Sequence, residues 1–371
     1  MTAAEIPSLY LHVPFCASIC YYCDFCRRIY QKEIADQWLD AIAEELCHTE
    51  IGSGLETIYV GGGTPTCLSI TQLDRLLGLL DHYKTSETEY TVEVNPETAG
   101  DEILSCLFAH GVNRLSIGMQ SGDDAILSRL NRHHTKADME DLIRRIRSHG
   151  LTNYSLDLMY SLPDQTMESL QDSTRFALSL KPAHLSLYSL TIEENSVFGK
   201  RGVKPLDIDT EADMYEWLCR YLPEQGYEQY EISNFASEGR YSRHNVNVWN
   251  YRDFYGIGYG AWGKEPGLRY THADKLSSYL KSPLERVSTF LSNKEEMYET
   301  LMMGLRLRQG VDRRLFWTHF GKDIMEVYPL TTRALVEEGM IETADSFLRC
   351  SERGYEILNT LLVRFMEEAD L

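Results

Sequence analysis

The chain has 371 residues, of which 43% are hydrophobic, enough for one large domain or two modest ones, and its formal charge is −20. This acidity disfavours proteins that bind the phosphate backbone, so we expect no nucleic-acid partner. The opening segment MTAAEIPSLYLHVPFC has no basic region and no long apolar run, so we expect no signal peptide. No apolar run is long enough to span a membrane, which predicts a cytoplasmic location, with peripheral membrane contact as an alternative.

The first 200 residues alternate between apolar strand patterns and helical patterns. Strands are expected at 8–13, 57–63, 90–96, 113–120, 153–163 and 184–190. Helices are expected at 33–46, 69–83 with Ser69 as its cap, 101–111, 123–131, 136–150 and 166–180. The strands are apolar on both faces, as in a parallel sheet covered by helices. Six β–α units predict an α/β fold, either an open sheet or a barrel, with its chemistry at the carboxyl ends of the strands.

The pattern changes after about residue 200. A helix at 210–226 and an edge segment at 227–236 precede an aromatic and glycine-rich stretch at 242–263. Helices at 293–310, 313–321 and 331–341, a hairpin at 341–351 and a last helix at 354–365 resemble a winged helix. Because residues 296–371 carry more acidic than basic side chains, this part is expected to pack or to contact a partner rather than DNA. We therefore expect three units, at 1–200, 201–290 and 291–371.

Four of the nine cysteines, Cys16, Cys20, Cys23 and Cys26, fall within eleven residues. Such crowding in a chain expected to be cytoplasmic indicates a metal site rather than a disulfide framework. The spacing allows a zinc site, a ferredoxin-like cluster with Cys26 as fourth ligand, or a three-ligand cluster that leaves one iron open. The remaining cysteines are expected to be buried and inert, and they are Cys47, Cys67, Cys106, Cys219 and Cys350.

Polar residues and glycines recur where the expected strands end. They are Cys16, the glycine turn at 61–64, Glu93, Asn95, Gln120 and Asp157. Because the carboxyl ends of parallel strands share one rim, these features predict a single site inside a curved sheet. The turn VGGGTPT offers backbone N–H groups that bind a carboxylate, or a surface that pairs with an amino group.

The spacing Cys16-x3-Cys20-x2-Cys23, followed by VGGGTPT after the next strand, resembles the radical S-adenosylmethionine (SAM) superfamily. The resemblance implies a partial (β/α)6 TIM-like barrel and a [4Fe–4S] cluster held by Cys16, Cys20 and Cys23. It also implies that the methionine part of SAM binds the fourth iron. One electron from the cluster then breaks the S–C5′ bond and gives a 5′-deoxyadenosyl radical.

Further motifs resemble the HemW family of haem chaperones, relatives of oxygen-independent coproporphyrinogen III oxidase. They include SLYLHVPFC, EVNPE, NRLSIGMQS, DLMYSLPDQT, GIGYGAWGK and LMMGLRLRQGVD. The oxidase has a further cysteine two places after the third one, where this chain has Phe25, and a longer segment before its cysteines. Both differences favour the chaperone.

The resemblance implies a protein that binds the cluster, SAM and haem and delivers haem to respiratory proteins. An electron donor such as flavodoxin or ferredoxin is implied, and a homodimer is compatible with the sequence. Three alternatives remain: the oxidase, a methyltransferase that opens haem, and a zinc-stabilised barrel without radical chemistry. In the two enzyme alternatives, reductive SAM cleavage acts on a porphyrin.

The resemblance also assigns residues to SAM. The expected SAM-binding residues are Tyr10, Tyr22, Gly62, Gly63, Thr64, Glu93, Gln120, Arg132 and Asp157. The glycine turn and Thr64 would contact the amino and carboxylate groups, and Glu93 the ribose hydroxyls. Gln120, Arg132 and Asp157 match a second SAM pocket of the oxidase, so they bind SAM, bind haem or complete the rim. The alternative for Arg132 is a solvated ion pair, and for Glu93 a buried one.

A segment RHNVNVW matches a histidine–asparagine–aromatic motif that the family resemblance associates with haem. It implies that His244 ligates haem iron and that Trp249 and Tyr251 stack on the macrocycle. The family has tyrosine where this chain has Val248, and a histidine in a loop is commonly structural. Cys26 is the other departure, with a role as an inert thiol, a fourth cluster ligand or a haem contact left open.

Overall fold

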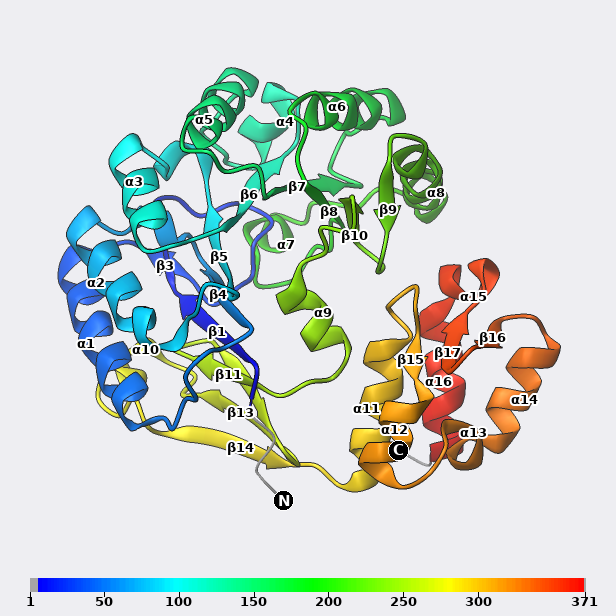
Figure 1. Cartoon of the computed structure of the whole chain (residues 1–371). Coiled ribbons are helices and arrows are strands. Elements are labelled where there is room, and N and C mark those ends of the chain that lie inside the picture. Colours follow the sequence, from blue (N-terminus) through cyan, green and yellow to red (C-terminus); the bar gives the residue numbers. More distant parts are fainter. Residues whose placement is uncertain (1–5, 370–371) are drawn as a thin grey trace.

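The computed structural model describes residues 6–369 and contains a twelve-stranded sheet (Figure 1). Residues 1–5, part of the segment expected to lack signal-peptide features, lie outside the described residues. Six neighbouring strands are parallel and follow the chain order. They are β1 (Ser8–Val13), β4 (Thr57–Gly62), β5 (Glu89–Val94), β6 (Arg114–Gln120), β7 (Tyr154–Tyr160) and β8 (His184–Ser189).

Helices between these strands cover the outside of the curved sheet (Figure 1). They are α1 (Lys32–His48), α2 (Ile70–Leu80), α3 (Asp101–Ala109), α4 (Asp124–Arg129), α5 (Lys136–Ser148) and α6 (Met167–Ser179). Ser69 caps α2 as expected. Its side chain accepts a hydrogen bond from the Gln72 backbone N–H, and the Gln72 side chain accepts one from the Ser69 backbone N–H. Trp38 of α1 and Leu73 of α2 are fully buried against the sheet.

Antiparallel strands extend both edges of the parallel sheet. Beyond β8 lie β10 (Asn234–Ser237) and β9 (Tyr227–Gln229). Beyond β1 lies the parallel strand β11 (Phe254–Ile257), followed by antiparallel β12 (Trp262–Glu265), β13 (Leu268–His272) and β14 (Arg286–Phe290). Because β14 and β9 end the strand order, the expected partial barrel is confirmed, and it is open within the described residues.

Strands β11–β14 were missed by the sequence reading. Their segment is rich in glycine, so it shows no strand periodicity, yet the glycines are required by close packing. A Cβ on Gly256 would clash with the Trp262 carbonyl on β12, and one on Gly263 would clash with the Tyr270 ring on β13. Before residue 293 the structure also has the long helix α8 (Ile208–Glu224) and the short elements β2 (Phe15–Cys16), β3 (Arg28–Ile29), α7 (Val197–Lys200), α9 (Arg243–Trp249) and α10 (Leu276–Tyr279), with 3₁₀ turns at 65–67, 81–83 and 96–98.

The C-terminal part is mostly helical and has a hydrophobic core of its own (Figure 1). Its helices are α11 (Asn293–Gly304), α12 (Arg313–Phe320), α13 (Ile324–Val327), α14 (Pro329–Glu337), α15 (Glu352–Glu356) and α16 (Leu358–Ala369). A small sheet joins β15 (Val311–Asp312), β17 (Phe347–Cys350) and β16 (Ile341–Ala344). The backbone N–H of Arg308 donates to the Tyr230 carbonyl at 2.9 Å and so ties this part to the sheet extension.

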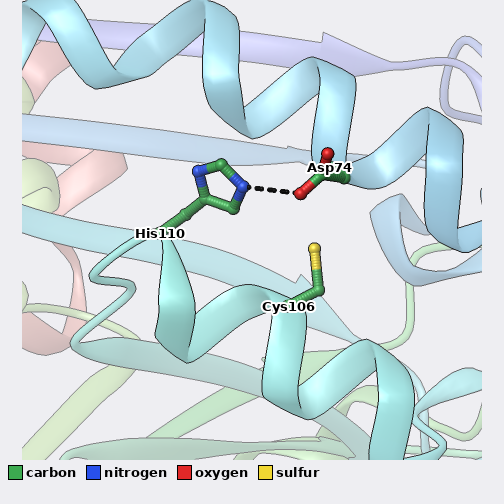
Figure 2. A group of neighbouring side chains, drawn as sticks. All are labelled: Asp74, Cys106 and His110. Atoms are coloured by element: carbon green, nitrogen blue, oxygen red, sulfur yellow. Dashed lines mark hydrogen bonds and ion pairs between the residues drawn. The ribbon is translucent and has the colours of Figure 1, made fainter.

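Helices α2 and α3 are joined on their outer side by polar contacts (Figure 2). His110, which follows the last residue of α3, contacts Asp74 of α2 through Nε2 at 3.1 Å and Asp81 through Nδ1 at 2.9 Å. Cys106 of α3 lies beside them and is buried, as expected. The expectation of burial was wrong for Cys47, which is exposed on α1. Cys47 directly follows the buried Leu46 on α1. Successive residues of a helix point in different directions, so Cys47 faces solvent while Leu46 faces the sheet.

None of the helices between residues 6 and 369 has the length and apolar character needed to cross a lipid bilayer.

Candidate functional site

The cysteine-rich loop begins directly after β1, at the carboxyl edge of the sheet. Phe15 anchors the start of the loop, with its ring edge-on to Trp38 at 5.6 Å and to Tyr30 at 6.3 Å between centroids. Cys16 is buried, and Cys20 and Cys23 are half-buried. The loop returns to the sheet through β3, which pairs with β2.

The glycine turn after β4 packs against the backbone of the cysteine loop. The N–H of Gly63 donates to the Val13 carbonyl and that of Thr64 to the Phe15 carbonyl, both at 2.7 Å. A Cβ on Gly63 would clash with the Phe15 carbonyl, so the glycine is needed for this close approach. Because the Gly62 N–H donates to Glu93 at 2.9 Å, these three N–H groups all bind within the chain. The turn therefore has no free N–H donor at these positions for a ligand carboxylate.

A cavity of about 460 Å³ lies at this rim and is called the cluster cavity below. It brings together residues from the cysteine loop and from the ends of successive strands. Of the residues predicted from the sequence, its lining includes Cys16, Cys20, Cys23, Tyr22, Gly62, Gly63, Thr64, Glu93, Asn95, Gln120, Arg132 and Asp157. Tyr10 does not line it and faces a neighbouring cavity.

The three thiols of the cluster cavity suit a metal cluster. Burial raises the pKa of Cys16 to about 12, although a hydrogen bond with Thr64 opposes the rise. Burial also raises the pKa of Cys23, against the nearby charge of Arg27. Thiolates are soft ligands, and bound iron removes their protons, so these residues fit a [4Fe–4S] cluster.

Glu93 is half-buried in the wall of the cluster cavity, without a cationic partner among the described residues. Its Oε1 accepts from the Tyr59 hydroxyl at 2.9 Å and its Oε2 from the Gly62 N–H at 2.9 Å. Burial raises the pKa of Glu93 to about 7, and the charge of Asp157 adds to the rise. Because both partners are uncharged, the alternative expectation of a buried ion pair at Glu93 is wrong among the described residues.

Asp157 lies on β7 and is surrounded by hydroxyl groups. It accepts from Ser116 at 2.9 Å and from Ser155 at 3.2 Å. Burial raises its pKa, and these hydroxyls oppose the rise. Gln120 ends β6 with a φ of 62°, where the pairing with β7 shifts register, so an irregular strand end places it in the cavity lining.

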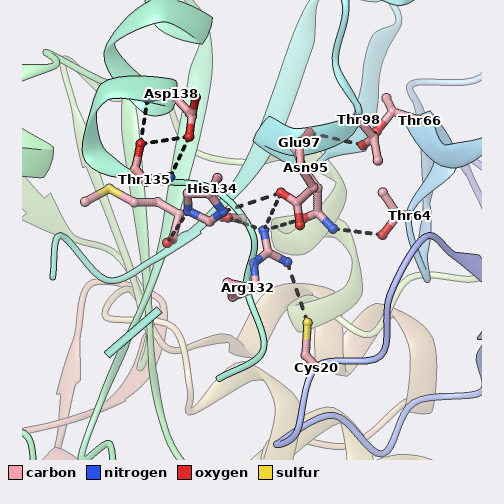
Figure 3. Close-up of polar contacts among 12 residues, drawn as sticks. Cys20, Thr64, Thr66, Asn95, Glu97, Thr98, Arg132, His134, Thr135 and Asp138 are labelled. Atoms are coloured by element: carbon pink, nitrogen blue, oxygen red, sulfur yellow. Dashed lines mark hydrogen bonds and ion pairs between the residues drawn. The ribbon is translucent and has the colours of Figure 1, made fainter. Parts of the chain in front are cut away.

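Arg132 joins Cys20 to a buried polar network (Figure 3). Its Nη2 donates to Asn95 Oδ1 at 2.9 Å and to the Gly118 carbonyl at 2.7 Å, and its Nη1 lies 3.7 Å from Cys20 Sγ. Glu97 lies 3.5 Å away. Arg132 is only 5% exposed, so the expectation of a solvated pair is wrong.

Glu97 contacts two side chains of this network, Arg132 and His134. Burial raises its pKa, but the hydrogen bond with His134 and the charge of Arg132 outweigh burial and lower that pKa to about 2. His134 lies more than 100 residues after the cysteines along the chain. Arg132 contacts both Cys20 and Glu97, and His134 contacts Glu97. His134 therefore helps to hold Glu97 and Arg132 in place beside Cys20 (Figure 3).

We expect Arg132→Met to lower the free energy of unfolding by about 3 kcal/mol or more, because it leaves the largely buried carboxylate of Glu97, 16% exposed, without its cation. Arg129→Met is the matched control, because its exposed pair with Asp164 contributes about 1 kcal/mol or less. Chemical denaturation of both variants measures the difference. The difference in free energy of unfolding between the unaltered protein and Arg132→Met should become smaller as pH falls from 4.5 toward 2, because Glu97 becomes protonated in the native state over this range. Equal losses in the two variants would contradict a buried role for Arg132.

A second cavity, of about 630 Å³, adjoins the first and is called the aromatic cavity below. The two cavities share lining residues, which are Phe25, Tyr59, Gly62, Glu93, Tyr188 and Asn245. The rest of the aromatic cavity includes Tyr10, His12, Cys26, His244, Trp249, Phe254 and Trp262. Cys26 thus lies apart from the three thiols of the cluster cavity, and its Sγ lies beside Gly260.

The sequence suggested a loop at His244, but this residue lies on the short helix α9. Its Nδ1 is 2.9 Å from Thr57 Oγ1, and its ring lies 5.1 Å from that of Tyr59 between centroids. Burial lowers its pKa to about 3, so the imidazole is neutral, which is the form that ligates iron. Helix α9 has only seven residues, capped by Ser242, too short to show a helical period.

The aromatic residues that follow His244 differ in position. Trp249 lines the aromatic cavity, with the Arg306 guanidinium 5.4 Å from its ring centroid. Tyr251 is not part of that lining. Its hydroxyl donates to Glu299 at 2.5 Å, and Lys264 lies over its ring. Of the two rings expected to stack on haem, only Trp249 lines the cavity. Trp262 and Phe254, which the sequence did not indicate, line it as well.

Comparison with known proteins shows the family of the chain. The radical SAM superfamily matches residues 10–177, and the HemN C-terminal domain matches residues 291–357. The haem chaperone HemW of Lactococcus lactis is 36% identical, with 97% of each chain covered. HemW of Bacillus subtilis is 34% identical, with 97% of this chain and 99% of that protein covered. The chain belongs to the HemW family.

Membership of this family places the chain in the radical SAM superfamily, which implies a [4Fe–4S] cluster and SAM as cofactors. The coproporphyrinogen III oxidase HemN of Escherichia coli has a similar structure, with a TM-score of 0.85 and 22% identity over 97% of this chain and 90% of that one. At this identity the likeness shows the fold only. The expected family and fold class are therefore confirmed, including the mostly helical C-terminal part.

Proposed function

We propose that this HemW-family protein is a haem chaperone that binds a [4Fe–4S] cluster and SAM in the cluster cavity and haem in the aromatic cavity. Haem passes from there to respiratory proteins, in the cytoplasm or at a membrane surface. The observation that carries this proposal is the pair of adjoining cavities, one lined by three thiols and the other by aromatic rings and a neutral histidine. The relatives from Lactococcus lactis and Bacillus subtilis are named haem chaperones, which supports the proposal.

In this proposal Cys16, Cys20 and Cys23 hold the cluster and leave one iron for SAM. The cluster, when bound, supplies an electron of low potential to the SAM sulfonium. The residues that would position SAM line the cluster cavity. They are Tyr22, Gly62, Gly63, Thr64, Glu93, Gln120, Arg132 and Asp157. Glu93 suits the ribose diol because a buried carboxylate accepts two hydrogen bonds from neighbouring hydroxyls.

Tyr10 takes a different place in the proposal from the one expected. It lies in the wall of the aromatic cavity, where its hydroxyl contacts His12 Nδ1 at 2.9 Å and its ring lies 6.0 Å from that of Tyr59. Tyr59 in turn contacts both Glu93 and His244. Tyr10 is thus placed to support the wall between SAM and haem.

The aromatic cavity suits haem both in the side chains that line it and in its volume of about 630 Å³. Pockets of about 300–1,000 Å³ lined by apolar rings hold cofactors of this size, and aromatic side chains cover the faces of a flat macrocycle. Neutral His244 supplies a nitrogen ligand of the kind that holds haem iron, and Trp249 supplies a stacking surface. Cys26 shares this cavity, so it is proposed to lie near haem rather than to ligate the cluster.

The function is tested with anaerobically reconstituted protein that is reduced and given SAM with either haem or coproporphyrinogen III. We expect haem to remain on the protein through gel filtration and no protoporphyrinogen to form. Haem then moves to a haem-free respiratory acceptor added in a second step. Turnover of coproporphyrinogen III to protoporphyrinogen would instead establish the oxidase and contradict the chaperone proposal.

We expect His244→Ala to weaken haem binding about tenfold or more, since it removes an iron ligand. Titration of ferric haem, followed by the Soret band, measures both the affinity and the ligand. His319→Ala is the control, because His319 is an exposed histidine of α12. An unchanged Soret band in His244→Ala, in protein with a normal unfolding transition, would remove His244 from the haem site.

A further inference from the structure

Three side chains with metal-binding atoms lie on the outer side of α2 and α3, among residues that line neither cavity. Asp74 belongs to α2, while Cys106 and His110 are four residues apart and therefore share one side of α3. One ligand atom from each, a carboxylate oxygen, a sulfur and a ring nitrogen, lies within 4.8 Å of the others (Figure 2). This spacing allows all three to contact one ion.

The ring of His110 is oriented by a second carboxylate. Its Nδ1 is held by Asp81 Oδ2 at 2.9 Å, while the other oxygen of Asp81 binds Lys84. Nε2 is thereby turned toward Asp74, at 3.1 Å. Metal-ligating histidines commonly bind a carboxylate through the nitrogen that does not touch the metal, because this fixes the tautomer and the ring orientation.

We propose that Asp74, Cys106 and His110 form a site for a divalent cation of the zinc type. Nitrogen, oxygen and sulfur together suit a borderline-soft ion that accepts four ligands in a tetrahedral arrangement. The side chain of Asp74 is 70% exposed, so solvent reaches the site and supplies the fourth ligand. The cation takes the place of the Cys106 thiol proton and of the proton between His110 Nε2 and Asp74, and both protons are released to water.

The site lies at the opposite rim of the sheet from the cysteine loop. Helix α3 runs back from the carboxyl end of β5, and His110 comes four residues before β6 begins at Arg114. A cation here would join α2 to α3 at the amino end of the strands, so it stabilises the sheet and its helices without entering the chemistry of the cluster. Stabilisation follows from binding to the native state alone.

The test uses reconstituted protein with its cluster in place, freed of loose metal by a chelating resin and kept anaerobic. Titration with Co²⁺ is followed by difference spectroscopy. We expect one equivalent to give tetrahedral ligand-field bands with a thiolate-to-cobalt charge-transfer band, and Zn²⁺ to displace both. Cys106→Ser should lose the charge-transfer band, and Asp74→Asn and His110→Gln should bind about tenfold more weakly or worse. Cys47→Ser, which removes an exposed thiol elsewhere, should leave the spectrum unchanged.

Thermal unfolding gives a second readout that does not depend on cobalt. Zn²⁺ should raise the Tm of the unaltered protein and of Cys47→Ser, and at the same Zn²⁺ concentration should raise that of Asp74→Asn clearly less. Asp74 is exposed, so this variant is expected to fold even where a change at the buried Cys106 does not. A charge-transfer band that persists in Cys106→Ser, or equal Zn²⁺ stabilisation of Asp74→Asn, would overturn the proposal, as would the absence of binding to the unaltered protein.

Discussion

Replacing Cys16, Cys20 or Cys23 by alanine is expected to abolish the iron–sulfur cluster, with iron falling from about four atoms per chain to near zero. Each of these thiols lines the cluster cavity, and no other cysteine between residues 6 and 369 does. A site left with two thiolates lacks the ligands that hold a cubane. Iron and sulfide analysis after anaerobic reconstitution, with EPR of the reduced protein, measures the loss.

Cys26→Ala is the matched control, because it removes a thiol from the same loop. Cys26 lines the aromatic cavity, where its sulfur lies beside Gly260 and hydrogen bonds to Tyr259. We therefore expect this variant to keep its iron and its EPR signal. Loss of iron from Cys26→Ala would show that the ligand set is wrong and that Cys26 belongs to the cluster.

Glu93→Gln is expected to weaken SAM binding by about tenfold to a hundredfold, the loss typical of one or two hydrogen bonds to a charged group. Equilibrium dialysis with the cluster in place measures the affinity. Tyr59→Phe is the companion variant, because it removes the hydroxyl that orients Glu93 and keeps the carboxylate. We expect it to have a smaller effect. Unchanged SAM affinity in Glu93→Gln would remove Glu93 from the SAM site.

The same variant should change how stability depends on pH. The pKa of Glu93 is raised to about 7 by burial, from an ordinary value of 4.5. The unfolded chain therefore loses this proton first as pH rises, and Glu93 lowers the free energy of unfolding by up to about 3 kcal/mol between pH 4.5 and 7. Glu93→Gln lacks this loss, so the unaltered protein should become less stable relative to the variant as pH rises through this range. A constant difference would contradict the buried, ionisable carboxyl.

Local signals predicted most of the parallel sheet. Apolar runs such as that of β1 and the cap at Ser69 depend on neighbouring residues in the chain, and the structure keeps them. The rim position of Glu93 and Asp157 also followed from strand direction alone. The division of the chain into three units, with boundaries near residues 200 and 290, stays a prediction.

The features that were missed depend on contacts between distant segments. Strands β11–β14 are set by close glycine packing such as that of Gly256 against β12. The burial of Arg132 requires Asn95 and Glu97 from a different β–α unit. The division between two cavities required the rings of Tyr59 and Tyr188 to be placed, because these side chains form the shared wall.

The most direct test of the proposed site is Mössbauer spectroscopy of the ⁵⁷Fe-reconstituted protein with and without SAM. Three protein thiolates leave one iron without a protein ligand, so we expect SAM to change the isomer shift and quadrupole splitting of one iron in four, and Glu93→Gln to need more SAM for the same change. A spectrum with four equivalent thiolate-bound sites, unchanged by saturating SAM, would contradict the account.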